Sequence, residues 1–285
     1  ILCDGKFTFE DENGNVVTKD AYDYIDYAMG YDKTKRFPLF VKPSRKISVK
    51  DVADVMRDHY EGTPMDMTQD IGAGGNALPY RWRPMGFEHD GKKYVNERAI
   101  ATQQTGFWFV GQSRGWLPDT IGGVNWFGCD DAATSYLTPI YTTINDVPEC
   151  FRVGNGNMIT YSPTSAFWVT NRVANACYKA YDMMAPTVRE AIDSWENEMI
   201  SAVAKADEEA LKMYNEAEKK PRKQIKRNDK AKKLVDPYAS VREYLTDFSV
   251  GNAQKIFNKW VDLEVLLLVK YIDGNVKAQH EDGSF

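Results

Sequence analysis

A long run of regularly spaced apolar residues in the last third of the chain constrains the fold most strongly. Between Pro186 and about Glu218, an apolar side chain recurs every three or four positions, at Val188, Ile192, Trp195, Met199, Val203, Ala206, Ala210, Met213 and Ala217. This spacing is typical of one face of an α-helix. Pro186 suits the first position of such a helix, where its missing N–H is not needed. We therefore predict a long helix with one buried stripe and an acidic opposite face.

Two neighbouring regions also have a helical pattern. A helix is expected from Ser165 to Tyr181, and a pair of helices from Tyr238 to Asp247 and from about Asn252 to Tyr271. In the last helix the inward-facing residues are expected to be Ile256, Trp260, Leu263 and Leu267. The segment 219–233 holds nine basic residues and one acidic residue, Asp229, which is too polar to pack. It is predicted to be a surface loop.

The first half of the chain has strand patterns instead. Alternating residues around Asn13-Gly14 predict a β-hairpin, because this dipeptide favours a tight turn. The segments 98–110, 122–129 and 135–141 are rich in aromatic and β-branched residues and predict a three-stranded antiparallel meander. The uninterrupted run FWFV, Phe107–Val110, predicts a strand covered on both faces.

Local signals place two short helices and a long loop before this meander. Ser48 offers an N-cap and Asp51 completes a capping box, so a helix is expected at about 48–59. A second short helix is expected at 22–31. The glycines and prolines of 70–88 predict a long loop, and long loops in compact domains often have a function.

Together these patterns predict an α+β protein in which a sheet is layered against helices. We expect a β-rich part at 1–164, with the helix at about 48–59, and a helical part at 165–285, with the basic loop at about 219–233.

Composition excludes several classes of function. The net charge of −5 gives no general reason to expect nucleic acid or an anionic membrane as a partner. No apolar run approaches the roughly 20 residues needed to cross a bilayer; the longest is the short cluster Val265–Val269. The four cysteines are widely spaced without a CxxC pair, so we expect buried thiols rather than a zinc site or a disulfide framework. The chain has no Walker-type phosphate loop and no HExxH motif.

A few polar residues are candidates for binding or catalysis. Gln112 and Arg114 lie two positions apart, so both side chains could reach one carboxylate or oxyanion; a solvated Arg at a sheet edge is the alternative. Arg81 and Arg83 could hold a substrate carboxylate, or stack as surface cations on Trp82.

His59 and Glu61 lie where the helix at about 48–59 is expected to end. The helix dipole would stabilise a histidine cation at that position. For His59 this purely local role is the alternative to a catalytic one. Capping of the turn explains Glu61 adequately.

Several blocks of sequence resemble a known family. They are MRDHYEGTPMDMT at 56–68, ALPYR at 77–81, TQQTGFWFVGQSRGWLP at 102–118, GGVNWFGCDDAATSYLTPIY at 122–141, SAFWVTNRVANA at 165–176 and the tail beginning YLTDFSVGNAQ at 244. In this order they resemble the PepD-like, secernin-related cysteine dipeptidases. The resemblance implies part of an αββα sandwich of the N-terminal-nucleophile hydrolase type. It also implies hydrolysis of a dipeptide substrate through a thioester, with no metal and no organic cofactor.

In that family the nucleophile is an N-terminal cysteine, whose free α-amine acts as the base. Ile1 has no nucleophilic atom and Cys3 has an amide nitrogen, so we expect the C-terminal part of a dipeptidase, inactive without its N-terminal part. The resemblance assigns stabilisation of the intermediate to Arg114, and substrate binding to Gln112, His59, Glu61, Arg81 and Trp126. The alternatives are an acylase for non-peptide amides and a non-catalytic ligand-binding module. A homo-oligomer is left open.

Overall fold

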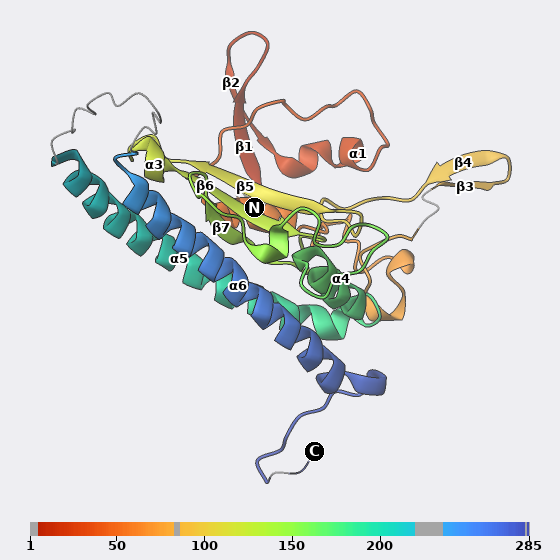
Figure 1. Ribbon diagram of the computed structural model, residues 1–285. Coiled ribbons are helices and arrows are strands. Elements are labelled where there is room, and N and C mark those ends of the chain that lie inside the picture. Colours follow the sequence, from red (N-terminus) through yellow and green to blue (C-terminus); the bar gives the residue numbers. More distant parts are fainter. Residues whose placement is uncertain (1–4, 83–85, 220–235, 283, 285) are drawn as a thin grey trace.

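A three-stranded antiparallel sheet lies at the centre of the computed structural model, which describes residues 5–82, 86–219, 236–282 and 284 (Figure 1). The strands are β5 (Phe107–Ser113), β6 (Gly123–Cys129) and β7 (Thr138–Tyr141), in the order β5-β6-β7. Phe107 lies opposite Cys129, and Val124 lies opposite Tyr141. The predicted meander is therefore confirmed.

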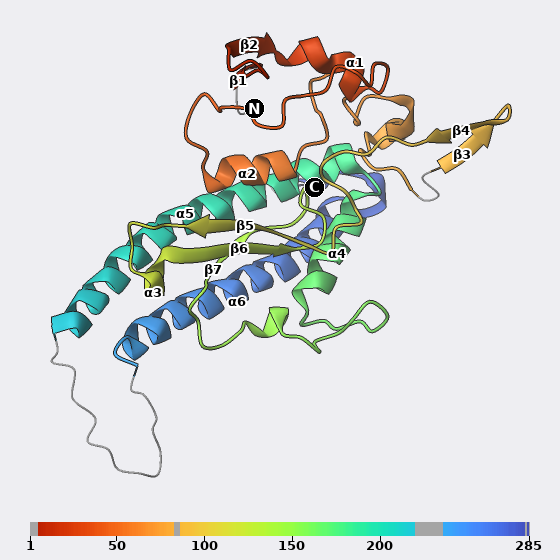
Figure 2. The same cartoon turned by 90° about the horizontal axis from the view of Figure 1, so that it is seen from above.

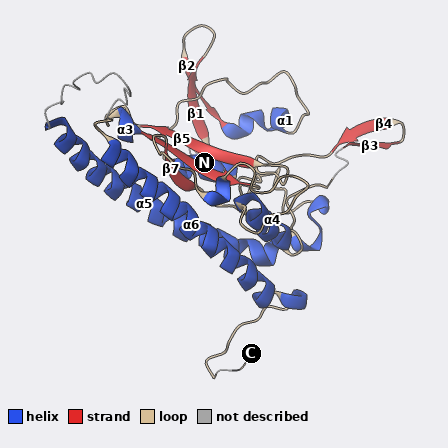
Figure 3. Cartoon of the chain, viewed as in Figure 1, coloured by secondary structure: helices blue, strands red, loops and turns tan. Residues whose placement is uncertain are grey.

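Long helices cover one face of this sheet (Figures 1 and 3). They are α4 (Ala166–Cys177), α5 (Tyr181–Lys219) and α6 (Ala239–Lys270). The predicted stripe of α5 is buried from Val188 to Ala210, and all four inward residues predicted for α6 are buried. Trp195 of α5 also donates a hydrogen bond of 3.0 Å from Nε1 to the Leu137 carbonyl just before β7. The helix layer and the sheet therefore share one core.

Shorter elements surround this core (Figure 2). In chain order they are β1 (Lys6–Glu10), β2 (Val16–Asp20), η1 (Ala21–Tyr24), α1 (Ile25–Ala28), α2 (Val49–Met56), η2 (Ile71–Asn76), β3 (Gly86–His89), β4 (Lys92–Val95), α3 (Asp119–Gly122), η3 (Glu149–Phe151) and η4 (Ile272–Gly274). The hairpin predicted at Asn13-Gly14 is confirmed, with Gly14 at φ 80°. So is the capping box of α2, in which the Ser48 side chain accepts from the Asp51 N–H.

Three expectations about individual elements were wrong. Phe107 and Phe109 of β5 are 62% and 56% exposed while Trp108 and Val110 are buried, because helices cover only one face of this strand among the described residues. Helix α5 begins at Tyr181, so Pro186 lies inside it rather than opening it.

The third error concerns α6, which is one helix rather than a pair. Gly251 lies inside it, at a usual cost of about 1 kcal/mol. Tertiary packing offsets this cost on either side: Ala253 is buried, and Ser249 Oγ accepts a 3.1 Å hydrogen bond from the Tyr141 N–H of β7.

The α+β class is confirmed by this mixture of helices and antiparallel strands. The division near residue 164 stays a prediction. Of the predicted basic loop, residues 220–233 lie outside the described residues, as do Arg83 and Cys3. No helix in the described part of the chain is long and apolar enough to span a membrane.

Candidate functional site

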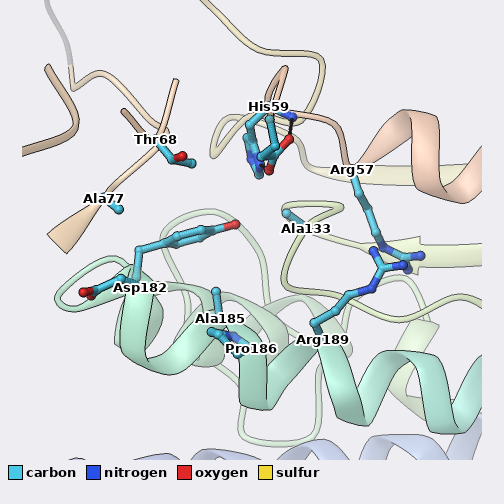
Figure 4. Close-up of a pocket in the computed structure, with 11 residues that line it drawn as sticks. Arg57, His59, Thr68, Ala77, Ala133, Asp182, Ala185, Pro186 and Arg189 are labelled. Atoms are coloured by element: carbon cyan, nitrogen blue, oxygen red, sulfur yellow. Dashed lines mark hydrogen bonds and ion pairs between the residues drawn. The ribbon is translucent and has the colours of Figure 1, made fainter. Parts of the chain in front are cut away.

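A cavity of about 480 Å³ lies where the end of α2, the loop after β6 and the start of α5 meet (Figure 4). Its walls come from four segments distant in sequence. The lining residues are Arg57, His59, Glu61, Thr68, Ala77, Ala133, Tyr181, Asp182, Ala185, Pro186 and Arg189. Two of the residues predicted from sequence, His59 and Glu61, are therefore brought to one cavity.

His59 is fixed in this wall by contacts on every side. Its side chain is 1% exposed, Nδ1 lies 2.9 Å from Glu61 Oε1, and Nε2 lies 2.9 Å from the Tyr80 hydroxyl. Its backbone N–H also donates to Glu61 Oε2 at 2.7 Å. The rings of Tyr80 and Tyr181 pack edge-on against the imidazole.

The two hydrogen-bond partners of the ring differ in charge. Burial raises the pKa of Tyr80 well above its ordinary value, so its hydroxyl keeps its proton. Burial opposes ionisation of Glu61, but the hydrogen bonds from His59 lower the pKa of that carboxyl below its ordinary value. His59 Nδ1–H therefore donates to a carboxylate. With both nitrogens engaged, His59 serves as a positioned wall of the cavity.

Arg57, two residues before His59, anchors this turn in the core. Its guanidinium is 3% exposed and pairs with Glu196 of α5, with Nη2 2.6 Å from Oε1 and Nη1 3.0 Å from Oε2. It donates further hydrogen bonds to the carbonyls of Ala132 and Ser135, and it lies 4.8 Å from the centre of the Trp108 ring. The pair joins α5, the turn after α2 and the loop after β6.

Arg189 lies on the opposite wall in a more exposed network. Its Nη2 is 2.6 Å from Asp54 Oδ1 of α2, and its Nε is 3.0 Å from Asp193 Oδ2. Lys50 contacts the same two carboxylates. Both arginines of the cavity are thus paired with carboxylates, whereas the Glu61 carboxylate is half exposed and accepts a hydrogen bond from His59 Nδ1.

Two adjacent acidic residues lie behind the cavity, directly after β6. Asp131 is buried and accepts from the Ala133 N–H and the Tyr178 hydroxyl, each at 3.0 Å. Asp130 is also buried, at φ 69°, and accepts at Oδ1 from Asn171 at 3.2 Å. Its other oxygen has no hydrogen-bond partner within the described structure. Burial raises the pKa of Asp130 to about 7.

Gln112, Arg114 and Trp126 are brought together in a different cavity, also of about 480 Å³, between α2, β5 and α5. Trp126 donates from Nε1 to Gln112 Oε1 at 3.1 Å. Arg114 is buried, forms an ion pair with Asp207 of α5, and donates to the carbonyls of Ile121 and Gly122. Its guanidinium is occupied by groups of the fold; the role predicted for it stays a prediction.

Arg81 lines a third cavity, of about 960 Å³, on the side of α1 and the loop 60–72. It is buried and forms ion pairs with Asp70 and, at 3.0 Å, with Glu97. The six predicted site residues are therefore distributed over three cavities.

Sequence reasoning missed several residues that line the first cavity or support its walls. The position of Glu196 beside the apolar stripe of α5 could have predicted a buried ion pair, because a buried carboxylate needs a partner. Two consecutive acidic residues at a strand end, Asp130 and Asp131, were a further signal. No sequence pattern indicated Arg189 or Tyr181, because they reach the cavity only when α5 packs against the end of α2.

Comparison with known proteins gives a consistent set of relatives. Residues 21–194 match the model of Peptidase family C69. The chain is similar to a "Probable dipeptidase B" of Lactococcus lactis, 26% identical over 151 residues, which cover 53% of this chain and 28% of the relative. It is also similar to a "Probable dipeptidase" of Latilactobacillus sakei, 27% identical over 174 residues, covering 60% and 32%.

A third relative, "Dipeptidase A" of Lactobacillus helveticus, is 21% identical over 228 residues, 79% of this chain and 40% of the relative. The chain thus spans about a third of the length of the curated relatives it matches.

Proposed function

Because the chain belongs to peptidase family C69, we propose that it is part of a dipeptidase and that the cavity beside His59 holds the dipeptide. The observation that carries this proposal is the wall formed by Glu61, His59 and Tyr80, in which a buried imidazole fixes a half-exposed carboxylate at the cavity. A positioned charge in a concave, partly apolar site is a common arrangement for recognising a small molecule.

The charge of the cavity favours a substrate with a free α-ammonium group. Arg57 and Arg189 are paired with carboxylates of the fold, and Glu61 is an anion held at the wall by His59. Pro186 lies inside α5 and cannot donate the helical hydrogen bond to the Asp182 carbonyl, so this carbonyl lacks its usual intrahelical donor at the wall. Both groups suit the amino end of a dipeptide. An N-acyl amino acid, the substrate of the alternative acylase function, has no such cation.

Binding measurements test this assignment. We expect dipeptides with a free amino group to bind the full chain at least ten-fold more tightly than their N-acetyl forms, in calorimetric titrations at neutral pH. Glu61→Gln should remove most of that preference, because it removes the charge and keeps the shape. The matched control is Glu88→Gln on the exposed β3 strand, which should bind as the wild type does.

Equal binding of free and N-acetyl dipeptides would favour the acylase alternative. Binding that Glu61→Gln leaves unchanged would place the substrate elsewhere.

For the chemistry we propose attack by an N-terminal cysteine that lies outside the described residues. Its thiol would add to the peptide carbonyl, the amine would leave as the C–N bond breaks, and water would hydrolyse the thioester. The described thiols support this assignment by their environment. Burial raises the pKa of Cys129, Cys150 and Cys177 to about 12 in each case, so they are thiols rather than thiolates at neutral pH.

Thiol labelling and turnover test the nucleophile. In the Cys3→Ala variant, the three remaining thiols should react with an aromatic disulfide reagent only after denaturation. The 285-residue chain alone should show no dipeptide turnover. Turnover that Cys3→Ala abolishes would make Cys3 the nucleophile. Rapid labelling of the folded Cys3→Ala variant would show that a described thiol is reactive. Binding without turnover, even with an N-terminal segment restored, would favour the ligand-binding module.

A further inference from the structure

Helix α6 has an apolar face that points away from the core. Near its C-terminal end, Val265, Leu268 and Val269 are 56%, 67% and 59% exposed, and Ile272 directly after the helix is 43% exposed. The same part of the helix buries Leu263, Leu267 and Tyr271 against the core. At 100° per residue the two sets lie on opposite sides. A helix that is apolar on both sides is normally covered on both sides.

The four exposed side chains Val265, Leu268, Val269 and Ile272 form a ridge, and a groove lies directly beside it. It has a volume of about 640 Å³ and is formed by the end of α4, the start of α5 and the end of α6. Met183 and Ala180 contribute apolar lining, and Leu268 and Ile272 belong to both the ridge and the groove. In Figure 1 this end of α6 extends beyond the sheet, so a second protein could approach it.

We propose that this surface binds a second copy of the chain, with the ridge of each copy in the groove of the other. In a dimer with a two-fold axis, the same surface of both copies forms the interface. Because the ridge and the groove are adjacent on one molecule, each copy can insert its ridge into the groove of the other. Opposite charges are available at its rim. Asp262 is exposed one turn before Val265, and Lys179 is exposed at the edge of the groove.

The area of the surface suits a weak dimer. The four ridge side chains, each roughly half exposed, offer on the order of 400 Å² per copy, about half of the ~800 Å² that each partner of a standard interface buries. The contacted part of the groove adds to this, which gives an interface of the small size typical of a weak complex. An exposed apolar patch of this size is itself typical of an interaction site.

Analytical ultracentrifugation tests the proposal. The full chain is expected to dimerise in the micromolar range, and Leu268→Asp should raise the dissociation constant at least ten-fold. The control Val153→Asp changes a fully exposed valine away from α6 and should leave dimerisation unaltered. Circular dichroism of both variants checks that the fold is kept. A wild-type chain that stays monomeric at 100 µM overturns the proposal, as does a dimer that Leu268→Asp leaves intact.

Cross-linking tests which parts meet. In a Cys3→Ser background, Leu268→Cys on one copy and Met183→Cys on another should give a covalent dimer with a short bismaleimide when the two variants are mixed. Each variant alone should give much less product. Equal product from either variant alone overturns the ridge-in-groove arrangement. A monomeric chain that sediments with anionic phospholipid vesicles would assign the surface to lipid.

Discussion

Replacing Glu196 by Leu is expected to lower the free energy of unfolding by about 3–5 kcal/mol, one of the largest effects of any single substitution in this chain. Arg57 would keep its charge at 3% exposure without the carboxylate that compensates it. The Leu137 N–H would also lose its acceptor, since it donates to Glu196 Oε1 at 3.0 Å. Urea unfolding at neutral pH, followed by tryptophan fluorescence, measures the change.

Helix α5 supplies a matched control two residues further along. Glu198 pairs with Lys255 and Lys259 at the surface, so Glu198→Leu should cost less than about 1 kcal/mol. In the double variant Arg57→Leu/Glu196→Leu neither partner leaves an unpaired charge behind, and most of the lost stability should return. If Glu196→Leu were no more destabilising than Glu198→Leu, the buried pair would contribute little to the fold.

This pair also connects stability to the candidate site. Arg57 lies two residues before His59, and its guanidinium joins the turn after α2 to the carbonyls of the loop after β6. Both segments line the cavity. Loss of the pair should therefore loosen the walls around the proposed substrate before the whole chain unfolds.

Elements defined by neighbouring residues were predictable from the sequence. The Ser48 and Asp51 capping box, the Asn13-Gly14 turn and the stripe of α5 depend on contacts within a few positions, and all three are confirmed. Their signals are local because a cap, a turn and a helix face are each completed by a few consecutive residues.

Features that depend on tertiary packing were not predictable in the same way. Phe107 and Phe109 look like core residues by type, but the side of β5 on which they lie is exposed in the described structure. A pair of helices was expected in place of α6, yet Ser249, between the two expected helices, contacts Tyr141 within one continuous helix.

The candidate site also combines residues that a local pattern indicates with residues that only tertiary packing brings together. His59 and Glu61 could be selected because they are two residues apart and meet in one turn. The partner of Arg57 is 139 positions away in sequence, so the pattern of α5 indicates that Glu196 needs a partner but not which residue it meets. Gln112, Arg114 and Trp126 line one cavity, which is separate from that of His59.

Asp130 should make the stability of the chain depend on pH in a characteristic direction. Burial, and also the nearby charge of Asp131, raises its pKa to about 7, whereas an unfolded chain would have a value near 3.9. Between these two values the folded state binds more protons than the unfolded state. Stability is therefore expected to fall as the pH rises from about 4 to about 7, and this contribution stays constant above that.

Asp130→Asn is consequently expected to stabilise the chain at pH 8 by on the order of 3 kcal/mol and to change little at pH 4. Asparagine is neutral at both pH values, keeps the oxygen that accepts from Asn171, and tolerates the φ of 69°. Asp90→Asn is the matched control, because Asp90 also has a positive φ, 48°, but a side chain that is 85% exposed. Urea unfolding at the two pH values should therefore separate Asp130 from Asp90. A gain of equal size at pH 4 and pH 8 would show that ionisation of Asp130 is not the cause.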